Sequence, residues 1–570
     1  VLCGWVHRRR DHGGVIFIDL RDRTGLAQVV FKPDTAPDAH ARAEEVRSEF
    51  VLAVRGRLES RGADSVNPNL PTGEVEILAS EIRVLNSATT PPFAIEDDVD
   101  VEEAVRLRHR IHDLRRPVMQ RRLQLRHRLL QSVRATLSGL GLLEIETPFL
   151  ARATPEGARD FLVPSRMQPG SFYALTQSPQ ILKQLLMVAG FDGYFQVARC
   201  FRDEDLRADR QPEFSQIDLE MSFVGVDDVL AVLEELTARA FSEVIGVELP
   251  RPFPRLGFRD AIARYGSDKP DTRIQLELVD LTEIFTKSDF QVFARAVESG
   301  GVVWTLPLPE AGDLSRGELD RLVERAQEWG AKGLAWIRLT ASGEWQSPIA
   351  KYLSEAEREK ILERTGVGPG DMLLFVADRE GVASVVLSRL RQTLGDRLDR
   401  TDGREWDSFF VVDYPLFEQQ EDGSVVPMHM PFVAPAEDDL HLLETEPLRV
   451  RSTQYDLVIN GNEIGSGSLR IHRPDVQNRM LEHLGYSAEE ARAQFGFLLD
   501  ALGTGAPPHG GFAFGVDRLV MLMSGSQSLR DTLAFPKTQR GQDLFLEAPS
   551  PVDPEQLREL GLRLLPGGKG

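Results

Sequence analysis

The stretch CFRDEDLRADRQPEFSQIDLE, residues 200–220, decides the fold assignment because it joins two strand-like segments through a charged loop. It holds seven acidic residues and three arginines. The segments GYFQVARCF (193–201) and FSQIDLEMSF (214–223) flank the loop, so the pattern predicts a β-hairpin with a long charged tip. Side chains alternate along a strand, which places Gln216, Asp218 and Glu220 on one face. The structural alternative to a binding site is a solvated charged hairpin.

A second informative segment, GGFAFGVDRLVML (510–522), reads as a glycine-rich strand that leads into an apolar helix. Glycine lets a flat ring or another backbone approach closely. Arg518 then lies at a strand–helix junction, which is a favourable place to meet a phosphate. Glycine-rich strands are common, so this segment is a weak signal when taken alone.

The third segment is a helix, about Met119 to Ser138, followed by LLEIETPFL (142–150). The second part reads as a strand interrupted by Pro148. Proline cannot donate to a sheet ladder, so we expect an edge or interface strand here.

The composition is that of a soluble globular protein: 42% of the 570 residues are hydrophobic and 27% are charged. The net charge of −21, taken alone, argues against nucleic-acid binding. The charge is uneven, however, because nine arginines face one aspartate between Arg106 and Arg128. This cluster either holds nucleic-acid phosphates or pairs with acids across a dimer, and the sequence does not choose between them.

Two cysteines, Cys3 and Cys200, provide neither a disulfide framework nor a cysteine-based zinc site. The simplest expectation is therefore a reducing, cytoplasmic environment. We find no run of 18 apolar residues and expect no membrane span. The first residues predict a strand rather than a signal peptide.

The predicted fold class is a multidomain α+β protein. Five short strands and one helix in residues 1–87 suit an OB-fold barrel, with another small β-barrel or half-sandwich as the alternative. A proline-rich, acidic linker follows. We predict these boundaries: 1–87 barrel, 88–118 linker, 119–279 first part of a mixed core, 280–408 an inserted domain, 409–540 second part of that core, and 541–570 a C-terminal extension.

Together the three segments resemble the three signature motifs of class II aminoacyl-tRNA synthetases. Further segments resemble the bacterial aspartyl-tRNA synthetases, and the resemblance covers nearly the whole chain. These segments are TPEGARDFLVPSR (154–166), QSPQILKQLLM (177–187), YGSDKPDTR (265–273) and GFAFGVDRL (511–519). The resemblance implies an antiparallel catalytic core, the bacterial inserted domain, and a homodimer formed around the Pro148 strand.

The resemblance also implies the chemistry. L-Aspartate and ATP would give aspartyl-adenylate and pyrophosphate, and the aspartyl group would then pass to tRNA-Asp. Arg202, Glu204 and Arg518 are the implied catalytic residues, because an arginine fork suits phosphate oxygens. The implied ATP contacts are Arg202, Asp203, Glu204, Gln211, Glu463, Gly515, Val516, Asp517 and Arg518. Asp456 and Glu463 would hold Mg²⁺, which prefers carboxylate oxygens; a turn residue at a strand end is the structural alternative for Asp456.

A positive pocket is needed to tell aspartate from its near-isostere asparagine. Lys183 and Arg470 are the implied cations. The resemblance also assigns Glu156, Gln180, Arg202, Asp218 and His429 to the aspartate site. Met430 stands where many bacterial relatives have a second histidine, which puts one loop contact in doubt.

The barrel would bind the tRNA anticodon through Arg10, His12, Phe17, Gln28 and Glu74 (or Glu76), with Phe17 as a stacking platform. The structural alternative is that Phe17 belongs to the barrel core and that the basic run 7–10 is only solvated. His12 suggests relaxed specificity, in which tRNA-Asn is charged as well. The competing functions are a synthetase for asparagine or lysine and an inactive paralogue that only binds RNA.

Overall fold

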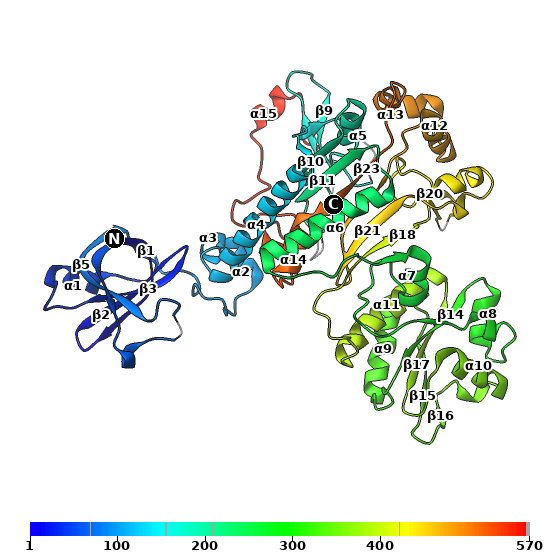
Figure 1. Ribbon diagram of the computed structural model, residues 1–570, viewed down its shortest axis with the longest axis horizontal. Coiled ribbons are helices and arrows are strands. Elements are labelled where there is room, and N and C mark those ends of the chain that lie inside the picture. The colour runs from blue at the N-terminus through cyan, green and yellow to red at the C-terminus, as the bar shows by residue number, and fades with distance from the viewer. Residues whose placement is uncertain (69, 154–156, 207–209, 421, 566–570) are drawn as a thin grey trace. The chain divides into compact units, whose positions relative to one another are not determined.

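The computed structural model describes residues 1–68, 70–153, 157–206, 210–420 and 422–565 (Figure 1). The chain forms two compact units. The first unit comprises residues 1–127, 205–211 and 524–553, and the second comprises residues 128–204, 212–523 and 554–570. Among the described helices, none has the length and apolar character needed to cross a membrane.

The first unit begins with a closed five-stranded barrel in the order β1-β2-β3-β5-β4, with β1 also paired to β4. Ile16 and Ile18 point inward and are buried, whereas Phe17 between them is partly exposed. The strand order and the helix between β3 and β4 confirm the OB-fold expectation. The elements are β1 Leu2–His12, β2 Val15–Asp22, β3 Gly25–Phe31, α1 Pro37–Glu45, β4 Val51–Ser60, the 3₁₀ turn η1 Ala63–Ser65 and β5 Val75–Asn86.

A buried carboxylate, Asp113, organises the helices that follow the barrel. It accepts hydrogen bonds from Arg110 and, at 2.7 Å, from Arg116. Arg110 is 1% exposed and also donates to the backbone carbonyls of Arg530, Leu533 and Ala534. The elements of this region are α2 Glu103–Arg108, α3 Arg110–Asp113, the first half of α4 Pro117–Gly139 and η6 Leu529–Thr532.

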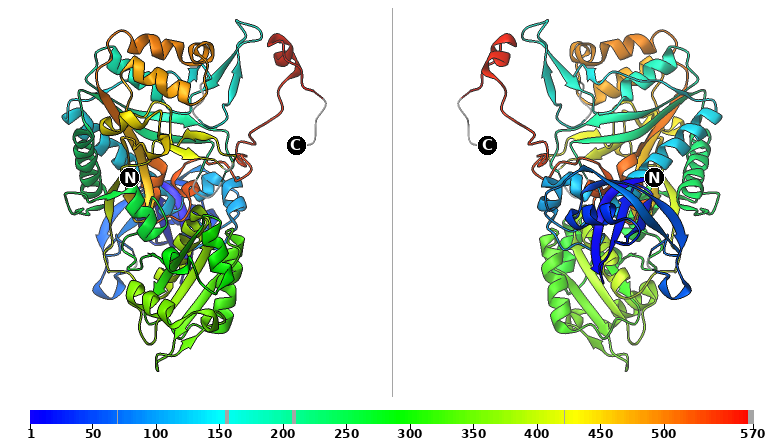
Figure 2. Two further views of the ribbon diagram at one scale, coloured as in Figure 1. Left: turned by 90° about the vertical axis from the view of Figure 1, so that its right-hand side faces the viewer. Right: turned by 90° about the vertical axis from the view of Figure 1, so that its left-hand side faces the viewer.

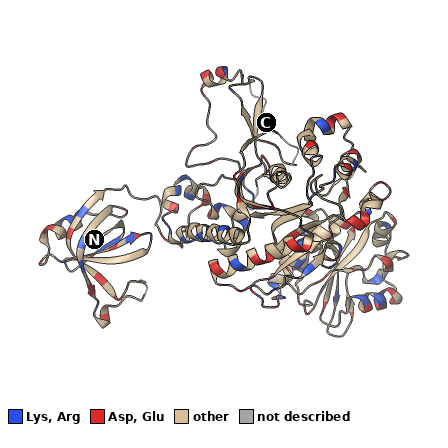
Figure 3. Ribbon diagram, turned by 45° about the horizontal axis from the view of Figure 1, so that its top comes forward, with Lys and Arg blue, Asp and Glu red and all other residues tan. Residues whose placement is uncertain are grey.

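Most arginines of residues 106–128 have acidic partners in the first unit. Figure 3 colours the basic and acidic residues along the ribbon. Arg106 and Arg122 each lie 3.3 Å from Asp531, and Arg121 lies 2.7 Å from Asp97. The sequence left open whether these arginines bind nucleic-acid phosphates or acids of a second subunit, and the paired ones instead bind acids of their own chain. They stabilise the fold of the first unit, and neither a nucleic acid nor a second subunit is needed to neutralise them.

Glu49 joins the barrel to this helical region. Its carboxylate is 2% exposed and accepts from Arg21 of the barrel and from Arg115, each at 2.7 Å. The Arg115 guanidinium also lies 5.3 Å from the centre of the Trp5 ring. One buried acid thus ties two parts of the first unit together.

The second unit is built on an eight-stranded sheet in the order β12-β18-β21-β22-β23-β11-β10-β6. Its strands are antiparallel except at the two edges, where β12 pairs with β18 and β6 with β10 in parallel. The strands are β6 Leu143–Glu144, β10 Gly193–Phe201, β11 Glu213–Ser222, β12 Arg255–Gly257, β18 Ser408–Val412, β21 Gln454–Ile459, β22 Asn462–Leu469 and β23 His509–Gly515. The helices packed near them are α5 Gln180–Val188, α6 Val226–Ile245, α7 Phe258–Tyr265 and α14 Val516–Met523.

The predicted hairpin of residues 193–223 is confirmed as β10 and β11, which pair from Gly193↔Met221 to Phe201↔Glu213. The single strand expected at 142–150 is instead two short strands in different sheets, β6 and β7 Leu150–Ala151. Pro148 lies between them, where the missing N–H breaks the ladder. Each of these strands is at the edge of its sheet, as the proline predicts.

The inserted region is a five-stranded antiparallel sheet, β13-β14-β17-β15-β16, with helices on both faces (Figure 2). Alternate residues of β14 and β17 supply two cores: Trp304 and Leu374 point to the side of α9 and α11, and Val303 and Phe375 point to the other. The elements are β13 Val279–Asp280, η2 Thr282–Phe285, α8 Gln291–Glu298, β14 Val302–Leu308, α9 Arg316–Glu328, β15 Ala335–Leu339, β16 Trp345–Gln346, η3 Ala350–Tyr352, α10 Glu355–Thr365, β17 Met372–Asp378 and α11 Glu380–Arg397.

The first core of the insertion includes residues that precede it in the chain. Ile274, Leu276 and Leu278 are buried in it. The Arg391 side chain of α11 donates to the carbonyls of Asp271, Ile274 and Leu276 at 2.6–2.8 Å. The connecting segment is therefore part of the hydrophobic core of the inserted domain.

Smaller elements complete the second unit. They form a three-stranded sheet, β7-β9-β8, a two-stranded sheet, β19-β20, and several helices. Their bounds are β8 Leu162–Pro164, β9 Phe172–Leu175, β19 Phe417–Gln419, β20 Val425–Pro427, η4 Glu437–Leu442, η5 Pro447–Arg449, α12 Pro474–His483, α13 Ala488–Leu502 and α15 Pro554–Glu559.

Replacing Asp113 by alanine should destabilise the first unit strongly, because Arg110 and Arg116 would be left as buried charges without their carboxylate. Breaking a buried pair in this way costs about 3–5 kcal/mol. The midpoint of thermal unfolding, followed by calorimetry, measures the effect. The control is Glu144→Ala, which removes an exposed partner of Arg134 and should cost less than about 1 kcal/mol. Equal effects of the two variants would contradict the role assigned to Asp113.

Candidate active site

The eight-stranded sheet brings distant segments side by side in two rows on one face. One row runs Asp456, Ser466, Ala513, Asp218 and Gln196, each residue paired with the next across neighbouring strands. The second row runs Gln454, Ser468, Gly511, Glu220 and Tyr194. The rows are two residues apart on every strand, so both lie on the same face. Small residues stand in the middle of each row: Ser466 and Ala513 separate Asp456 from Asp218, and Ser468 and Gly511 separate Gln454 from Glu220.

Gly511 makes room for a carboxylate. A β-carbon at this position would lie 2.1 Å from the Glu220 Oε2 atom and 2.1 Å from the Leu219 carbonyl oxygen. No side chain fits there without moving the backbone of β11. In the glycine-rich strand predicted from the sequence, packing against β11 therefore requires glycine at position 511.

Four buried charges form a network at one end of the rows. Lys183 Nζ, from α5, lies 2.6 Å from Asp218 Oδ1 and 3.2 Å from Glu220 Oε2. Arg470 follows β22, and its Nε donates to Glu220 Oε1 at 3.0 Å while its Nη1 donates to Ser468 Oγ at 2.7 Å. All four charged side chains are at most 6% exposed. The solvated-hairpin alternative is therefore wrong, because the acidic face of β11 is buried and neutralised.

The two carboxylates of this network respond differently to burial. Burial raises the pKa of Asp218, although the positive charge of Lys183 opposes the shift. Burial would also raise the pKa of Glu220, but the charges of Arg470 and Lys183 outweigh it and the pKa is lowered. Glu220 is thus the firmly ionised member, and it holds both cations in place.

Gln180 adds a buried polar group beside the network. It is the first residue of α5, is 6% exposed, and its Nε2 has no hydrogen-bond partner among the described residues. An unsatisfied buried amide is costly and is commonly a ligand contact. Glu156, which the sequence assigns to the same pocket, lies outside the described residues.

A second polar cluster surrounds Asp456 at the other end of the rows. Asp456 Oδ2 accepts from the Tyr414 hydroxyl at 2.9 Å, and Oδ1 accepts from Gln454 Nε2 at 2.9 Å and from Ser466 Oγ at 2.8 Å. Burial, followed by the charge of Glu463, raises the pKa of Asp456 to about 7. The Asp456 side chain is thus a fully bonded, buried carboxylate rather than a residue of a surface turn.

Glu463, on β22, connects this cluster to two cations. Lys269 Nζ donates to its carboxylate at 3.0 Å, and Arg518 donates to its backbone carbonyl. Burial would raise the pKa of Glu463, but Lys269 and Arg518 outweigh it and the pKa is lowered. The His429 ring packs edge-on against Tyr414 at 5.1 Å, and burial lowers the pKa of His429. The negative charges of Glu463 and Asp268 oppose this shift of the His429 pKa but do not outweigh burial.

Asp456 and Glu463 fit a magnesium ion by their chemistry. Both are carboxylates on neighbouring strands, and the charge of Glu463 contributes to the raised pKa of Asp456. Among the described residues, no group of three or more metal-binding side chains exists. A cation at this place would therefore take its remaining ligands from water or from a bound phosphate.

The charged tip of the hairpin begins at the end of β10. Arg202 N–H donates to the Pro212 carbonyl at 2.8 Å, and the Arg202 guanidinium lies 5.1 Å from the centre of the Phe214 ring. Asp203 N–H donates to the Arg159 carbonyl at 3.0 Å and Asp203 is exposed. Glu204 is the last residue before the chain enters the first unit.

The remaining predicted nucleotide contacts lie on two units. Gly515 ends β23, and Val516, Asp517 and Arg518 form the first turn of α14. The Asp517 carboxylate accepts from the Ser215 N–H at 3.1 Å, which ties this turn to β11. Gln211 belongs to the first unit, where its amide makes hydrogen bonds of 3.0 and 2.8 Å with the backbone of Lys537.

On the barrel, the structure brings three predicted residues close together. Arg10 Nη2 donates to Asp19 at 2.7 Å and to Gln28 Oε1 at 3.3 Å. Gln28 Nε2 donates to Glu76 at 3.0 Å, so the acid in contact is Glu76 rather than Glu74, which is exposed. Phe17 is partly exposed on the neighbouring strand, and His12 is exposed at the end of β1.

Sequence reasoning missed three residues of the site. Glu220 was placed on the right face but was given no role, although its spacing from Asp218 was the available signal. Lys269 lies within the quoted segment YGSDKPDTR and also received no role. Nothing in the local sequence marks Tyr414, whose contact with Asp456 depends on the pairing of β18 with β21.

Comparison with known proteins gives consistent matches. The family model described as "tRNA synthetases class II (D, K and N)" matches residues 102–539. The model described as "OB-fold nucleic acid binding domain" matches residues 1–85.

Among similar sequences, a protein of Moorella thermoacetica named "Aspartate--tRNA(Asp/Asn) ligase" is 56% identical over 563 residues, which is 99% of this chain and 94% of the relative. A protein of Symbiobacterium thermophilum with the same name is 54% identical and covers 98% and 96% of the two chains. Among solved structures, the asparaginyl-tRNA synthetase of Pyrococcus horikoshii complexed with asparaginyl-adenylate has a TM-score of 0.59 at 18% identity, with 94% of each chain covered. A likeness at this identity shows the fold alone.

The raised pKa of Asp456 predicts a pH-dependent stability in the absence of divalent cations. The folded protein retains a proton up to about pH 7 that the unfolded chain loses near pH 4, so this contribution to stability is complete below pH 4 and is lost as the pH rises towards 7. The variant Asp456→Asn replaces this carboxyl group with an amide that is neutral at every pH. The free energy of unfolding of the variant, relative to the wild type, should therefore increase between pH 5 and pH 8, by on the order of 1–3 kcal/mol.

Urea unfolding at the two pH values measures this difference, and any pH-independent cost of the substitution cancels. The control is Asp402→Asn, because hydrogen bonding to Arg404 lowers the pKa of Asp402. Its effect should be the same at pH 5 and pH 8. A pH-independent effect of Asp456→Asn as well would show that Asp456 is ionised throughout this range.

Proposed function

The chain belongs to the class II tRNA synthetases of the aspartate, lysine and asparagine group, and we propose that it is an aspartate–tRNA ligase. It activates L-aspartate with ATP and transfers the aspartyl group to tRNA-Asp and tRNA-Asn. The observation that carries the choice of aspartate is the buried network of Lys183 and Arg470 with two acids. The choice of both tRNAs follows from the names of the relatives.

The network favours a carboxylate over an amide at the end of the substrate side chain. Lys183 and Arg470 can only donate hydrogen bonds. The side-chain NH2 of asparagine is also a donor, so it would find no acceptor on these two residues. The substrate α-ammonium is assigned to the acid and amide groups beside them, Asp218, Gln180 and Glu156. A lysine substrate would bring a third cation toward Lys183 and Arg470, which argues against that alternative.

In the first step, an oxygen of the aspartate α-carboxylate attacks the α-phosphorus of ATP, and the bond to the bridging oxygen breaks to release pyrophosphate. Arg202 is assigned to the α-phosphate, where its guanidinium fork would neutralise the charge that grows in the transition state. The Phe214 ring beneath it fixes its orientation. Arg518 is assigned to the γ-phosphate and Glu204 to the adenine amino group. The further assigned ATP contacts are Asp203, Gln211, Glu463, Gly515, Val516 and Asp517.

Asp456 and Glu463 are assigned to Mg²⁺, which when bound supplies positive charge that offsets the phosphate charges. The Tyr414 hydroxyl, Gln454 and Ser466 orient the Asp456 carboxylate. Lys269 keeps Glu463 ionised, so that it is ready to bind a cation. His429 packs on Tyr414 and is assigned to the wall of the aspartate pocket.

In the second step, the terminal ribose hydroxyl of tRNA attacks the aspartyl carbonyl carbon and AMP leaves. The barrel is assigned to the anticodon through Phe17, Arg10, His12, Gln28 and Glu76, with Glu74 as the more exposed alternative. A base can stack on Phe17 because the ring lies at the barrel surface. Cys3 and Cys200 are not joined in a disulfide within the described residues, and we assign the enzyme to the reducing cytoplasm, where tRNA is charged.

We also assign a homodimer to this enzyme. Leu150 and Tyr173 lie on one face of the small sheet β7-β9-β8, and Leu162 and Phe172 lie on the other. All four side chains are 45–60% exposed. Large exposed apolar side chains of this kind commonly mark a protein interface. They adjoin the Pro148 segment, which in the resemblance packs across a two-fold axis.

The function is tested by aspartate-dependent exchange of pyrophosphate into ATP, followed by charging of purified tRNA-Asp and tRNA-Asn. We expect exchange with aspartate and none with asparagine, and aspartylation of both tRNAs. Absence of exchange in a folded sample would overturn the enzyme assignment and leave RNA binding alone. Failure to charge tRNA-Asn would restrict the enzyme to tRNA-Asp.

The same assay tests His12. His12→Leu should lower the charging of tRNA-Asn relative to tRNA-Asp if this side chain contacts the anticodon. An unchanged ratio would make His12 a bystander. The exchange reaction, which needs no tRNA, monitors the folding of the catalytic core.

The dimer predicts that Leu150→Glu combined with Leu162→Glu yields a monomer in sedimentation equilibrium, because two charges would be buried at the interface. The matched control, Leu448→Glu, alters a side chain that is 40% exposed on η5 and should leave the mass unchanged. A wild-type protein that sediments as a monomer at micromolar concentration would contradict the assignment.

A further inference from the structure

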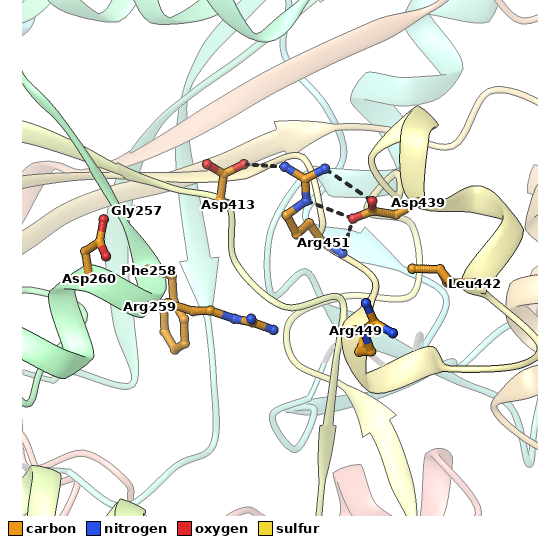
Figure 4. A pocket seen from close by; sticks show the side chains of 9 residues that line it. All are labelled: Gly257, Phe258, Arg259, Asp260, Asp413, Asp439, Leu442, Arg449 and Arg451. Carbon is orange, nitrogen blue, oxygen red and sulfur yellow. Dashed lines mark hydrogen bonds and ion pairs between the residues drawn. The ribbon is translucent and has the colours of Figure 1, made fainter. Parts of the chain in front are cut away.

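A pocket of about 380 Å³ lies outside the rows of the active site. It is formed by the start of α7, the end of β18, and the turns η4 and η5 (Figure 4). Its lining residues are Gly257, Phe258, Arg259, Asp260, Asp413, Asp439, Leu442, Arg449 and Arg451. Three arginines and three aspartates thus surround one cavity.

Two of the three aspartates are engaged by Arg451, and the third lies at the start of a helix. Asp439 accepts from Arg451 Nε at 2.8 Å, and Asp413 lies 3.8 Å from Arg451 Nη1. Asp260 is the third residue of α7, and its carboxylate folds back to within 3.5 Å of the place where a Gly257 β-carbon would be. In that position it offsets the positive end of the helix. Asp439 and Asp413 are therefore offset by Arg451, whereas Asp260 is offset by the helix start.

Two of the three arginines remain available to a ligand. Arg259 is exposed, extends into the pocket, and has no ion pair or hydrogen bond with any part of the chain that the structure describes (Figure 4). Arg449 has a side chain that is 66% exposed, and its partner Glu446 is itself exposed. Two guanidinium groups lining one cavity repel each other unless an anion lies between them. Arg259 is thus the arginine of the pocket that has no carboxylate partner among the described residues.

The pocket adjoins the proposed ATP site through one layer of rings. Phe258, in the pocket wall, packs on Tyr414 with ring centres 4.9 Å apart. Tyr414 donates to Asp456, and Asp413 next to it lines the pocket. The opposite wall is held to the same segment, because the Leu416 N–H donates to the Val450 carbonyl and the Ser452 N–H to the Tyr414 carbonyl, at 2.8 and 2.7 Å. An anion bound here would lie next to the reacting groups without touching them.

We infer that this pocket binds a phosphate of the tRNA acceptor end, held by Arg259 and Arg449. The inference rests on the proposed function, since that activity requires the 3′ end of a tRNA to reach the neighbouring site. Guanidinium forks match phosphate oxygens in pairs. The lining has no ring free to stack a base, because Phe258 is packed on Tyr414. The ligand is therefore recognised by its backbone charge and not by its base sequence.

The test uses Arg259→Gln and Arg449→Gln, alone and together, in the full-length protein. We expect the KM for tRNA in the charging reaction to rise roughly three- to tenfold for each single variant, because one charge-assisted contact to phosphate is lost. The slope of log Kd for tRNA against log salt concentration should fall by about 0.7 to 0.9 for each arginine. Both effects should be equal for tRNA-Asp and tRNA-Asn, since a backbone contact carries no sequence information.

The control is Arg239→Gln on α6, which alters an arginine whose side chain is 51% exposed and does not line the pocket. It should change neither the KM for tRNA nor the salt slope. Aspartate-dependent exchange, run in parallel without tRNA, separates the two hypotheses. Loss of exchange in the wild type would refute the proposed function, whereas normal exchange with unchanged tRNA parameters in the variants would refute the pocket.

A second arm distinguishes tRNA from a free anion. Inorganic phosphate and sulfate, which take no part in the reaction, are titrated as inhibitors of charging at fixed tRNA. Weak competition with tRNA that Arg259→Gln abolishes supports the site, because the free anion then occupies the place of the tRNA phosphate. Inhibition of exchange by the same anions, relieved by Arg259→Gln, would instead assign the pocket to a free anion and overturn the tRNA inference.

Discussion

The arrangement of the second unit depends on the burial of two cations and two carboxylates on one face of its sheet. Removing Lys183, Asp218, Glu220 and Arg470 from water is unfavourable unless each finds its partner at close range. The observed distances of 2.6–3.3 Å satisfy this condition. These distances require α5, β11 and the residue after β22 to keep fixed positions. The ion pairs therefore fix how three segments that are far apart in the sequence lie relative to one another.

The same constraint explains the small residues around the network. Gly511 leaves space for the Glu220 carboxylate, and Ser468 supplies a hydroxyl for Arg470. Farther along the rows, the Asp456 carboxylate is bonded by three neutral donors instead of a cation. The two ends of one sheet face thus differ in how their acids are satisfied: at one end two cations neutralise two carboxylates, and at the other neutral donors bond Asp456 while Lys269 pairs with Glu463.

Much of this organisation follows from the sequence, because strand alternation and glycine placement are local signals. The barrel strands, the hairpin of residues 193–223 and the strand–helix junction at Arg518 were all predicted from such patterns. The burial of the acidic face was not, since alternation identifies a face but not what covers it. The contact of Tyr414 with Asp456 and the role of Glu220 depend on the order of strands in the sheet. The resemblance to a family supplied assignments for Lys183 and Arg470, whereas their pairing with acids required the three-dimensional structure.

The insertion shares its core with the segment that leads into it. Ile274, Leu276 and Leu278 precede the boundary drawn from sequence, yet they are buried among the residues of α9, α11 and the inserted sheet. The inserted domain, taken as a folding unit, therefore begins before the boundary that the sequence predicts and includes the connecting segment. Recombination or a designed truncation at the boundary drawn from sequence would separate these three apolar residues from their packing partners. Exchange of this domain between proteins would succeed only where the connector travels with it.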